Sequence, residues 1–179
     1  MSTKINKQSR HLVLIFALYK GYITSTNNLI IKDNNQLRLI WKQKILNKVN
    51  IHNQIIQYNQ YYYLITKKYK FMSIYSKIAF KKLTNKLISK LTILDLSILY
   101  NDIGKLHFKR KNNIIHAIQL SLYTNVSKET NQQLIDYINN KWQINFFQLK
   151  HKDKYYLRCN TLMTKKFLKL INSYYKVDI

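Results

Sequence analysis

Histidine and acidic side chains, the groups that most often hold metals or move protons, are scattered along this sequence. No two of its five histidines are spaced like metal ligands, and they are His11, His52, His107, His116 and His151. The seven acidic residues form no convincing carboxylate pair, and Cys159 is the only cysteine, so no disulfide or thiolate metal site is expected. No phosphate-binding glycine loop or nucleophile-elbow motif is present. The sequence therefore predicts no catalytic residue, metal site, cofactor or small-molecule substrate.

Basic side chains are the abundant functional groups of this chain. Its 179 residues include 31 Lys and Arg against 7 Asp and Glu, a net charge of +24. Such a surface repels itself unless a polyanion neutralises it, and binding to nucleic-acid phosphates also releases counterions. A membrane is not expected as partner, because the apolar run Leu12–Tyr19 is too short to cross one and no helix pairs a basic face with a broad apolar one.

Many of the basic residues lie beside predicted strands. Lys105, His107 and Lys109 alternate with Leu106 and Phe108, so they should share one sheet face. The other candidate nucleic-acid-binding residues are Lys32, Arg38, Lys67, Lys68, Lys70, Arg110, Lys111, Lys150, Lys152, Lys154 and Arg158. An ordinary solvated face is the alternative for any one cluster. For the tyrosines of the hairpins we favour core packing over stacking on bases: Tyr61, Tyr62, Tyr63, Tyr155 and Tyr156.

Two similar runs of elements must position these residues. The apolar spacing predicts helices at His11–Lys20, Asn35–Asn47, Phe71–Leu83, Thr92–Asn101, Ser127–Asn140 and Thr164–Ile171. Strands are expected at Tyr22–Thr26, Leu29–Lys32, Ile51–Tyr58, Tyr61–Thr66, Leu106–Phe108, Ile114–Tyr123, Ile144–Leu149 and Tyr155–Cys159. The two glycines, Gly21 and Gly104, each follow the first helix of a run. We therefore predict an α+β fold built from a duplicated αββαββ plan, with repeats at residues 1–88 and 89–179.

Two segments that end at these glycines carry a family resemblance. Val13–Gly21 and Leu96–Gly104, with the elements between Leu122 and Ile171, resemble the two motifs and the C-terminal part of single-chain LAGLIDADG homing endonucleases and maturases. The resemblance implies a saddle of two antiparallel sheets that lies on a nucleic-acid duplex, with the two motif helices packed at its centre. In that family the carboxylate just before each motif glycine holds a divalent metal near the scissile phosphate.

This sequence departs from the family at both acids. Lys20 precedes Gly21 and Ile103 precedes Gly104. An ammonium repels a metal ion and an isoleucine cannot ligate one. Asp102 lies one residue early, about 100° around a helix, and we expect a solvated or capping role for it. The departures predict that cleavage is lost.

The leading hypothesis is a structural component of a mitochondrial ribosome, which binds ribosomal RNA and contacts neighbouring proteins. The many Lys, Asn, Ile and Tyr residues and the 2 Gly and 0 Pro indicate an A+T-rich gene, either in an organelle, with mitochondria favoured, or in a very A+T-rich nucleus. Codon drift alone does not explain why Glu129 is the only glutamate. The alternatives are a maturase that assists splicing of a group I intron and, third, an active DNA endonuclease.

Overall fold

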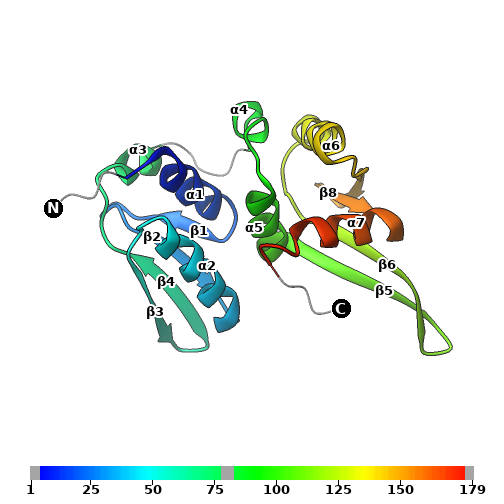
Figure 1. Cartoon of the computed structure of the whole chain (residues 1–179), viewed down its shortest axis with the longest axis horizontal. Helices are drawn as coiled ribbons and strands as arrows, with labels where there is room; N and C mark the ends of the chain where they lie inside the picture. The colour runs from blue at the N-terminus through cyan, green and yellow to red at the C-terminus, as the bar shows by residue number, and fades with distance from the viewer. Residues whose placement is uncertain (1–4, 78–82, 176–179) are drawn as a thin grey trace. The chain divides into compact units, whose positions relative to one another are not determined.

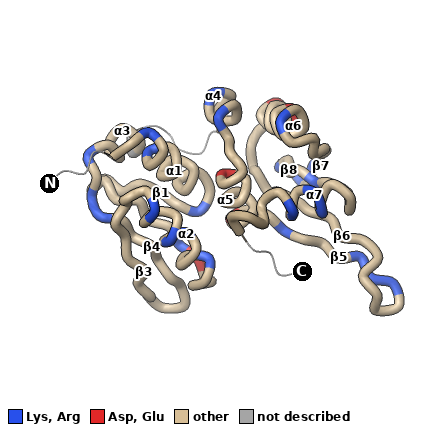
Figure 2. The backbone as a smooth tube through the Cα atoms, in the orientation of Figure 1, with Lys and Arg blue, Asp and Glu red and all other residues tan. Residues whose placement is uncertain are grey.

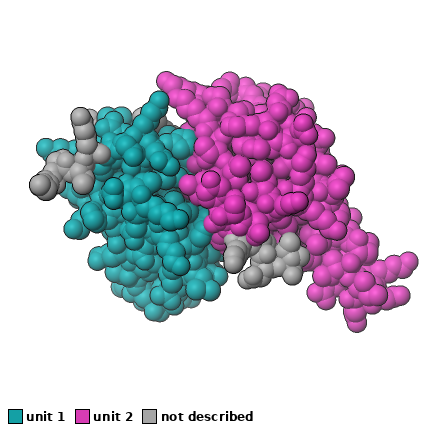
Figure 3. All heavy atoms as spheres, viewed as in Figure 1, with its two compact units in different colours: residues 1–82 teal, residues 83–179 magenta. Residues whose placement is uncertain are grey.

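The computed structural model describes residues 5–77 and 83–175. The chain divides into two compact units, unit 1 at Met1–Lys82 and unit 2 at Leu83–Ile179 (Figure 3). Residues 83–88 had been expected in the first repeat. They fall in unit 2 because the short helix α4 (Asn85–Ile88) packs on α6 (Lys128–Trp142).

Unit 1 follows the predicted order of helix, strand pair, helix and hairpin. Its elements are α1 (Lys7–Leu18), β1 (Gly21–Ile23), β2 (Leu29–Asp33), α2 (Gln36–Lys48), β3 (Asn53–Tyr58), β4 (Tyr61–Thr66) and α3 (Met72–Lys77). The helix predicted at Phe71–Leu83 corresponds to α3, and residues 78–82 of that prediction lie outside the described residues. The strands form an antiparallel sheet in the order β1-β2-β4-β3.

Unit 2 repeats this plan after α4 (Figure 1). Its further elements are α5 (Ile93–Ile103), β5 (Gly104–Lys111), β6 (Ile114–Leu122), α6, β7 (Phe147–His151), β8 (Lys154–Cys159) and α7 (Thr161–Ile171). The antiparallel sheet order β5-β6-β8-β7 matches that of unit 1 strand for strand. The predicted α+β class and duplicated αββαββ plan are confirmed.

Polar side chains start the helices. Thr92 accepts a hydrogen bond from the Asp95 amide, while the Asp95 carboxylate accepts one from the Thr92 amide, a capping box that begins α5. Ser127 caps α6 through the Thr130 amide, at the start of the helix predicted for Ser127–Asn140.

No helix among the described residues combines the length and apolar character needed to cross a membrane.

Asparagine and lysine replace glycine in the turns. Neither glycine has a positive φ. The described residues that do have one are Asn27, Asn50, Asn59, Asn112, Asn113, Asn125, Gln143 and Lys152. Asparagine tolerates the left-handed conformation at modest cost, which is why a chain with 2 Gly and 0 Pro still forms tight hairpins.

Both glycines allow a strand to begin against the helix before it. A Cβ on Gly21 would lie 2.5 Å from the carbonyl oxygen of Phe16, and one on Gly104 would lie 2.5 Å from that of Tyr100. Real Cβ atoms do not approach backbone this closely, so each glycine is required by the same helix-to-strand junction. This shared constraint explains why the two glycines occupy matching places in the two repeats.

Candidate nucleic-acid interface

One face of the unit 2 sheet is covered by helices and the other is open. Leu120, Leu122, Leu157 and Cys159 are fully buried, and α7 packs on β6 while α6 packs on β8 (Figure 1). Since successive strand residues point to opposite faces, the alternate positions form the open face of unit 2.

The open face of unit 2 carries a row of basic side chains. Lys105, His107 and Lys109 alternate with Leu106 and Phe108 along β5, which confirms that the three share a face. Lys105 pairs with Ser121, and Ser121 pairs with Arg158 on the next strand, so cations from two strands meet around one serine. Lys154 follows the same alternation on β8.

Aromatic contacts fix the orientation of Arg158 on this face. Its Nε donates a hydrogen bond to Ser121 Oγ at 3.1 Å, and its guanidinium carbon lies 5.3 Å from the centre of the Tyr156 ring. Tyr156 stacks on Tyr123 with ring centres 5.3 Å apart and planes inclined by 20°. A guanidinium held in one orientation loses less entropy when it binds a planar or phosphate group than a free lysine does.

His107 contributes a neutral ring to the same surface. Burial lowers the pKa of its imidazole, and the charges of Arg158 and Lys105 lower that pKa further. Its Nε2 is buried and has no hydrogen-bond partner. At neutral pH the open face of unit 2 therefore gains its positive charge from lysine and arginine rather than from this histidine.

Three predicted binding residues lie at the hairpin tips. Arg110 and Lys111 follow a register shift after Lys109 and are exposed where the β5–β6 ribbon continues past β8 (Figure 1). Lys152 occupies the left-handed turn between β7 and β8.

Two predicted binding residues lie away from the open faces. Lys150 pairs with Tyr155, which shares its face with buried Leu157, so Lys150 points to the helix-covered side and not with Lys154. Arg38 lies in the first turn of α2, where Asn35 Oδ1 accepts a hydrogen bond from its amide.

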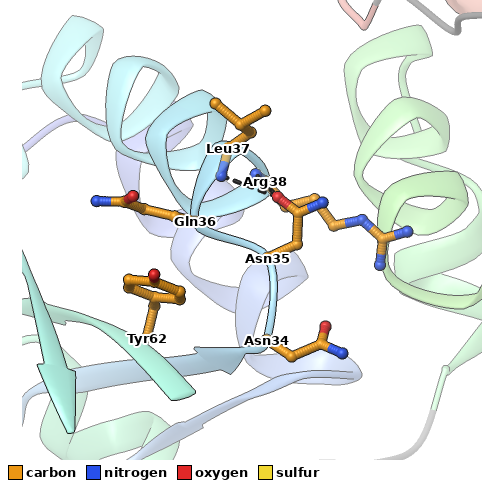
Figure 4. A pocket seen from close by; sticks show the side chains of 6 residues that line it. All are labelled: Asn34, Asn35, Gln36, Leu37, Arg38 and Tyr62. Carbon is orange, nitrogen blue, oxygen red and sulfur yellow. Dashed lines mark hydrogen bonds between the residues drawn. The ribbon is translucent and has the colours of Figure 1, made fainter. Parts of the chain in front are cut away.

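Arg38 lines a surface pocket of about 570 Å³ at the start of α2 (Figure 4). The pocket is lined by Asn34, Asn35, Gln36, Leu37, Arg38 and Tyr62. The Asn35 side chain already caps the helix through the Leu37 and Arg38 amides, and the Arg38 side chain extends away from Tyr62 (Figure 4). The pocket is therefore the space beside the capped first turn of α2.

In unit 1 the predicted lysines are divided between the sheet and a loop. In the unit 1 sheet Ile31 and Leu64 are buried on the helix-covered face, and the alternate positions form the open face of unit 1. Lys32, which pairs with Tyr63, lies on this open face. Lys67, Lys68 and Lys70 are exposed in the segment after β4, beyond the end of the strand.

The hairpin tyrosines divide between the two faces of their sheets. Tyr62 pairs with buried Asp33 on the helix side, whereas Tyr61 and Tyr63 lie on the open face of unit 1. Core packing was therefore the wrong expectation for Tyr61 and Tyr63, and equally for Tyr156, which stacks on Tyr123. Tyr155 lies on the helix side of its sheet and Tyr156 on the open face.

Lys20 forms an ion pair at the position where the family has its first acid. Its Nζ lies 2.8 Å from Oδ2 of Asp33, whose side chain has no exposed surface. Burial raises the pKa of the Asp33 carboxyl. The hydrogen bonds from Lys20 and the Asn35 amide and the charges of Lys20 and Lys42 outweigh burial, so that pKa lies below its ordinary value.

Asp33 was not predicted as a site residue, although the alternation of residues along β2 indicates that its side chain is buried. It continues the alternation of Leu29 and Ile31 along β2, which places a carboxylate on the buried face. A buried carboxylate requires a cation, so this pattern alone predicts a partner.

Asp102 is 8% exposed, so the expectation of a solvated acid was wrong. It lies in the last turn of α5, in a run of buried residues that includes Asn101. Ile103 is the last residue of α5, directly before Gly104. Within the described residues, no three His, Cys, Asp or Glu side chains group closely enough to hold a metal ion.

Comparison with known proteins identifies the fold and the family. The structure resembles the homing endonuclease I-WcaI bound to its DNA recognition sequence, with a TM-score of 0.73, 18% identity, and 96% of this chain and 84% of that chain covered. It also resembles the N-terminal LAGLIDADG domain of DUF199/WhiA (TM-score 0.55, 11% identity, 95% and 86% covered). A third match is I-DmoI in complex with DNA and Mn (TM-score 0.51, 12% identity, 96% and 97% covered). A search of the curated proteins found no match.

At such low sequence identity the structural matches show the fold alone, and a family model assigns the family. The model of the LAGLIDADG DNA endonuclease family matches residues 2–167. The chain belongs to the LAGLIDADG DNA endonuclease family.

Proposed function

We propose that this chain binds nucleic acid without cutting it. The observation that carries the proposal is the ion pair between Lys20 and Asp33 at the first acid position, with Nζ and Oδ2 2.8 Å apart. An ammonium there repels a divalent cation and already pairs with a buried carboxylate. Ile103 offers no ligand at the second position. The metal of the family therefore does not fit the residues at these two places.

Asp102 is the acid that a surviving nuclease activity would need. The test incubates the purified chain with a supercoiled plasmid library in Mg²⁺ and, separately, in Mn²⁺. We expect no nicked product from the parent chain. Nicking by the parent that disappears in Asp102→Asn would show that the chain still cuts, and the proposal would then be wrong.

We further propose that the bound nucleic acid is a structured RNA, within a mitochondrial ribosome. The net charge of +24 supports a polyanionic partner, and the open face of unit 2 presents Lys105, Lys109, Lys154 and Arg158 to it. The A+T-rich composition supports a gene in an organelle. Neighbouring proteins of the particle would contact the remaining surface.

Salt-washed mitochondrial ribosomes provide the test of the ribosomal role. We expect the chain to remain in particles purified at high salt and to crosslink to ribosomal RNA. Its absence from such particles would rule out an integral ribosomal role. Crosslinks concentrated in one group I intron, with splicing of that intron lost when the chain is removed, would instead establish the maturase function.

A further inference from the structure

The open faces of the two sheets differ in charge. Between Asn53 and Thr66 the sequence has no charged side chain, whereas β5 alone contains Lys105, Lys109, Arg110 and Lys111. Figure 2 shows the contrast, because the β3–β4 hairpin is tan throughout and the β5–β6 hairpin carries blue segments. A partner that contacts both faces must therefore present different chemistry to each.

Aromatic and branched side chains form the open face of unit 1. The register places these residues together on it: Tyr22, Ile30, Lys32, Gln54, Ile56, Tyr58, Tyr61, Tyr63 and Ile65. Tyr58 is 66% exposed, Tyr22 53% and Ile56 42%, so rings and aliphatic groups of these strands reach the surface of unit 1. An exposed set of aromatic and aliphatic side chains of this kind is a candidate binding surface.

Lys32 is the charged member of this face, and its charge lies on the rings. Its Nζ is 3.5 Å from the centre of the Tyr61 ring and 5.7 Å from that of Tyr63. This geometry holds one cation at the middle of the sheet by attraction to the ring faces. A single fixed cation beside exposed rings suits one phosphate with its base stacked next to it.

We propose that the open face of unit 1 binds unpaired bases of the RNA by stacking, while the open face of unit 2 binds phosphates. This inference rests on the proposed function. A chain of net charge +24 attracts a polyanion, yet this face has a single lysine, Lys32, against the row of cations on the open face of unit 2. The part of a polyanion that suits a neutral tyrosine surface is its bases, and stacking tolerates every base because each has a ring face. The favoured ligand is an RNA duplex that continues into a single-stranded segment.

The test compares two RNA probes with the same duplex, one blunt and one with a single-stranded tail of about six nucleotides, a typical site size for such surfaces. Binding to the full chain is followed by anisotropy, and stacking by fluorescence quenching of a 2-aminopurine in the tail. We expect tighter binding of the tailed probe. Tyr58→Ala should weaken that probe between about fivefold and a hundredfold, the usual loss for one stacked base, and leave the blunt probe unchanged.

Three further variants separate stacking from general apolar contact. Tyr58→Phe keeps a ring and should retain the preference for the tail, whereas Tyr58→Leu is apolar without a ring and should lose it. Tyr174→Ala removes a tyrosine that is 48% exposed outside both sheets, and should bind both probes as the parent does.

The possible failures of this inference and of the proposed function are distinguishable. Equal binding of both probes by the parent, or a preference retained in Tyr58→Leu, overturns the stacking inference while RNA binding stands. Loss of a protein neighbour from native particles in Tyr58→Ala, with both RNA affinities intact, would assign the face to a protein and also overturn it. If the parent binds neither probe, the proposed function itself fails.

Discussion

The substitution Lys20→Met tests the ion pair that replaces the first acid of the family. It removes the ammonium 2.8 Å from Asp33 Oδ2 and keeps a side chain of similar length. Removing one partner of a buried pair costs about 3–5 kcal/mol when the remaining charge has no other support. Here the Lys20 side chain is 28% exposed, and Asp33 keeps the hydrogen bond from the Asn35 amide and the field of Lys42. We therefore expect a loss of about 2–3 kcal/mol.

The two tryptophans allow each unit to be followed separately. Trp41 lies in α2 of unit 1 and Trp142 at the end of α6 in unit 2. Urea unfolding monitored by Trp41 fluorescence in a Trp142→Phe background reports the free energy of unfolding of the unit that contains the pair. Lys20→Met should shift this transition and leave the Trp142 transition, read in a Trp41→Phe background, in place.

A double substitution provides the matched control. Lys20→Met combined with Asp33→Asn removes both charges, and its unfolding free energy should return to within about 1 kcal/mol of the parent value, because no uncompensated carboxylate remains buried. Two results would refute the reasoning. One is a loss below about 0.5 kcal/mol in Lys20→Met, within the usual range of surface substitutions. The other is a double variant no more stable than the single one.

The same pair predicts a dependence of stability on acid. The pKa of Asp33 is lower in the folded chain than in the unfolded chain, so the unfolded state binds the proton first as pH falls. The stabilisation is complete above the unfolded pKa of about 3.9 and is lost as pH falls through the folded pKa. The difference in unfolding free energy between the parent and Asp33→Asn should therefore stay constant from pH 7 to about pH 5 and shrink below about pH 4.

Two further substitutions test the open face and the helix-to-strand junction. Lys105→Met should lower the slope of log affinity against log salt for the blunt RNA probe by about 0.7–0.9, whereas Lys150→Met, on the helix side of the same sheet, should leave it unchanged. Equal slopes for these two variants would contradict the assignment of the binding face. Gly104→Ala should lower the unfolding free energy read by Trp142 by about 1–3 kcal/mol, since its Cβ would lie 2.5 Å from the Tyr100 carbonyl oxygen. A change below about 0.5 kcal/mol would show that the junction relaxes freely.

The sequence allowed the elements and the repeat to be predicted, because both depend on local patterns. Alternation along β5 placed Lys105, His107 and Lys109 on one face, and the structure agrees. Asn27, Asn59 and Asn112–Asn113 form the turns between strands that the sequence predicted. The helix α4 was missed because four residues are too few to show a helical period.

What could not be predicted depends on contacts between distant elements. The strands expected at Ile144–Leu149 and Tyr155–Cys159 left residues 150–154 as the loop, whereas β7 continues to His151 and the turn is shorter. The position of the turn decides which side chains share a face, and it places Lys150 on the opposite face from Lys154. The burial of Asp102 reflects tertiary packing around the end of α5, which a helical wheel cannot show. The partner of Lys20 lies 13 residues away on β2, beyond the reach of any local pattern.

The placement of charge also bears on whether codon drift explains the basic composition. Drift toward A+T-rich codons acts on the whole gene, and lysine, asparagine, tyrosine and isoleucine codons are all A+T-rich. The β3–β4 hairpin consists largely of the last three residue types and contains no lysine from Asn53 to Thr66, while the β5–β6 hairpin of the same gene contains Lys105, Lys109 and Lys111. A bias that acts on the whole gene does not explain why the open face of unit 1 has one lysine, Lys32, while that of unit 2 has Lys105, Lys109 and Lys154. The difference between the faces therefore supports selection for a different surface chemistry in each repeat.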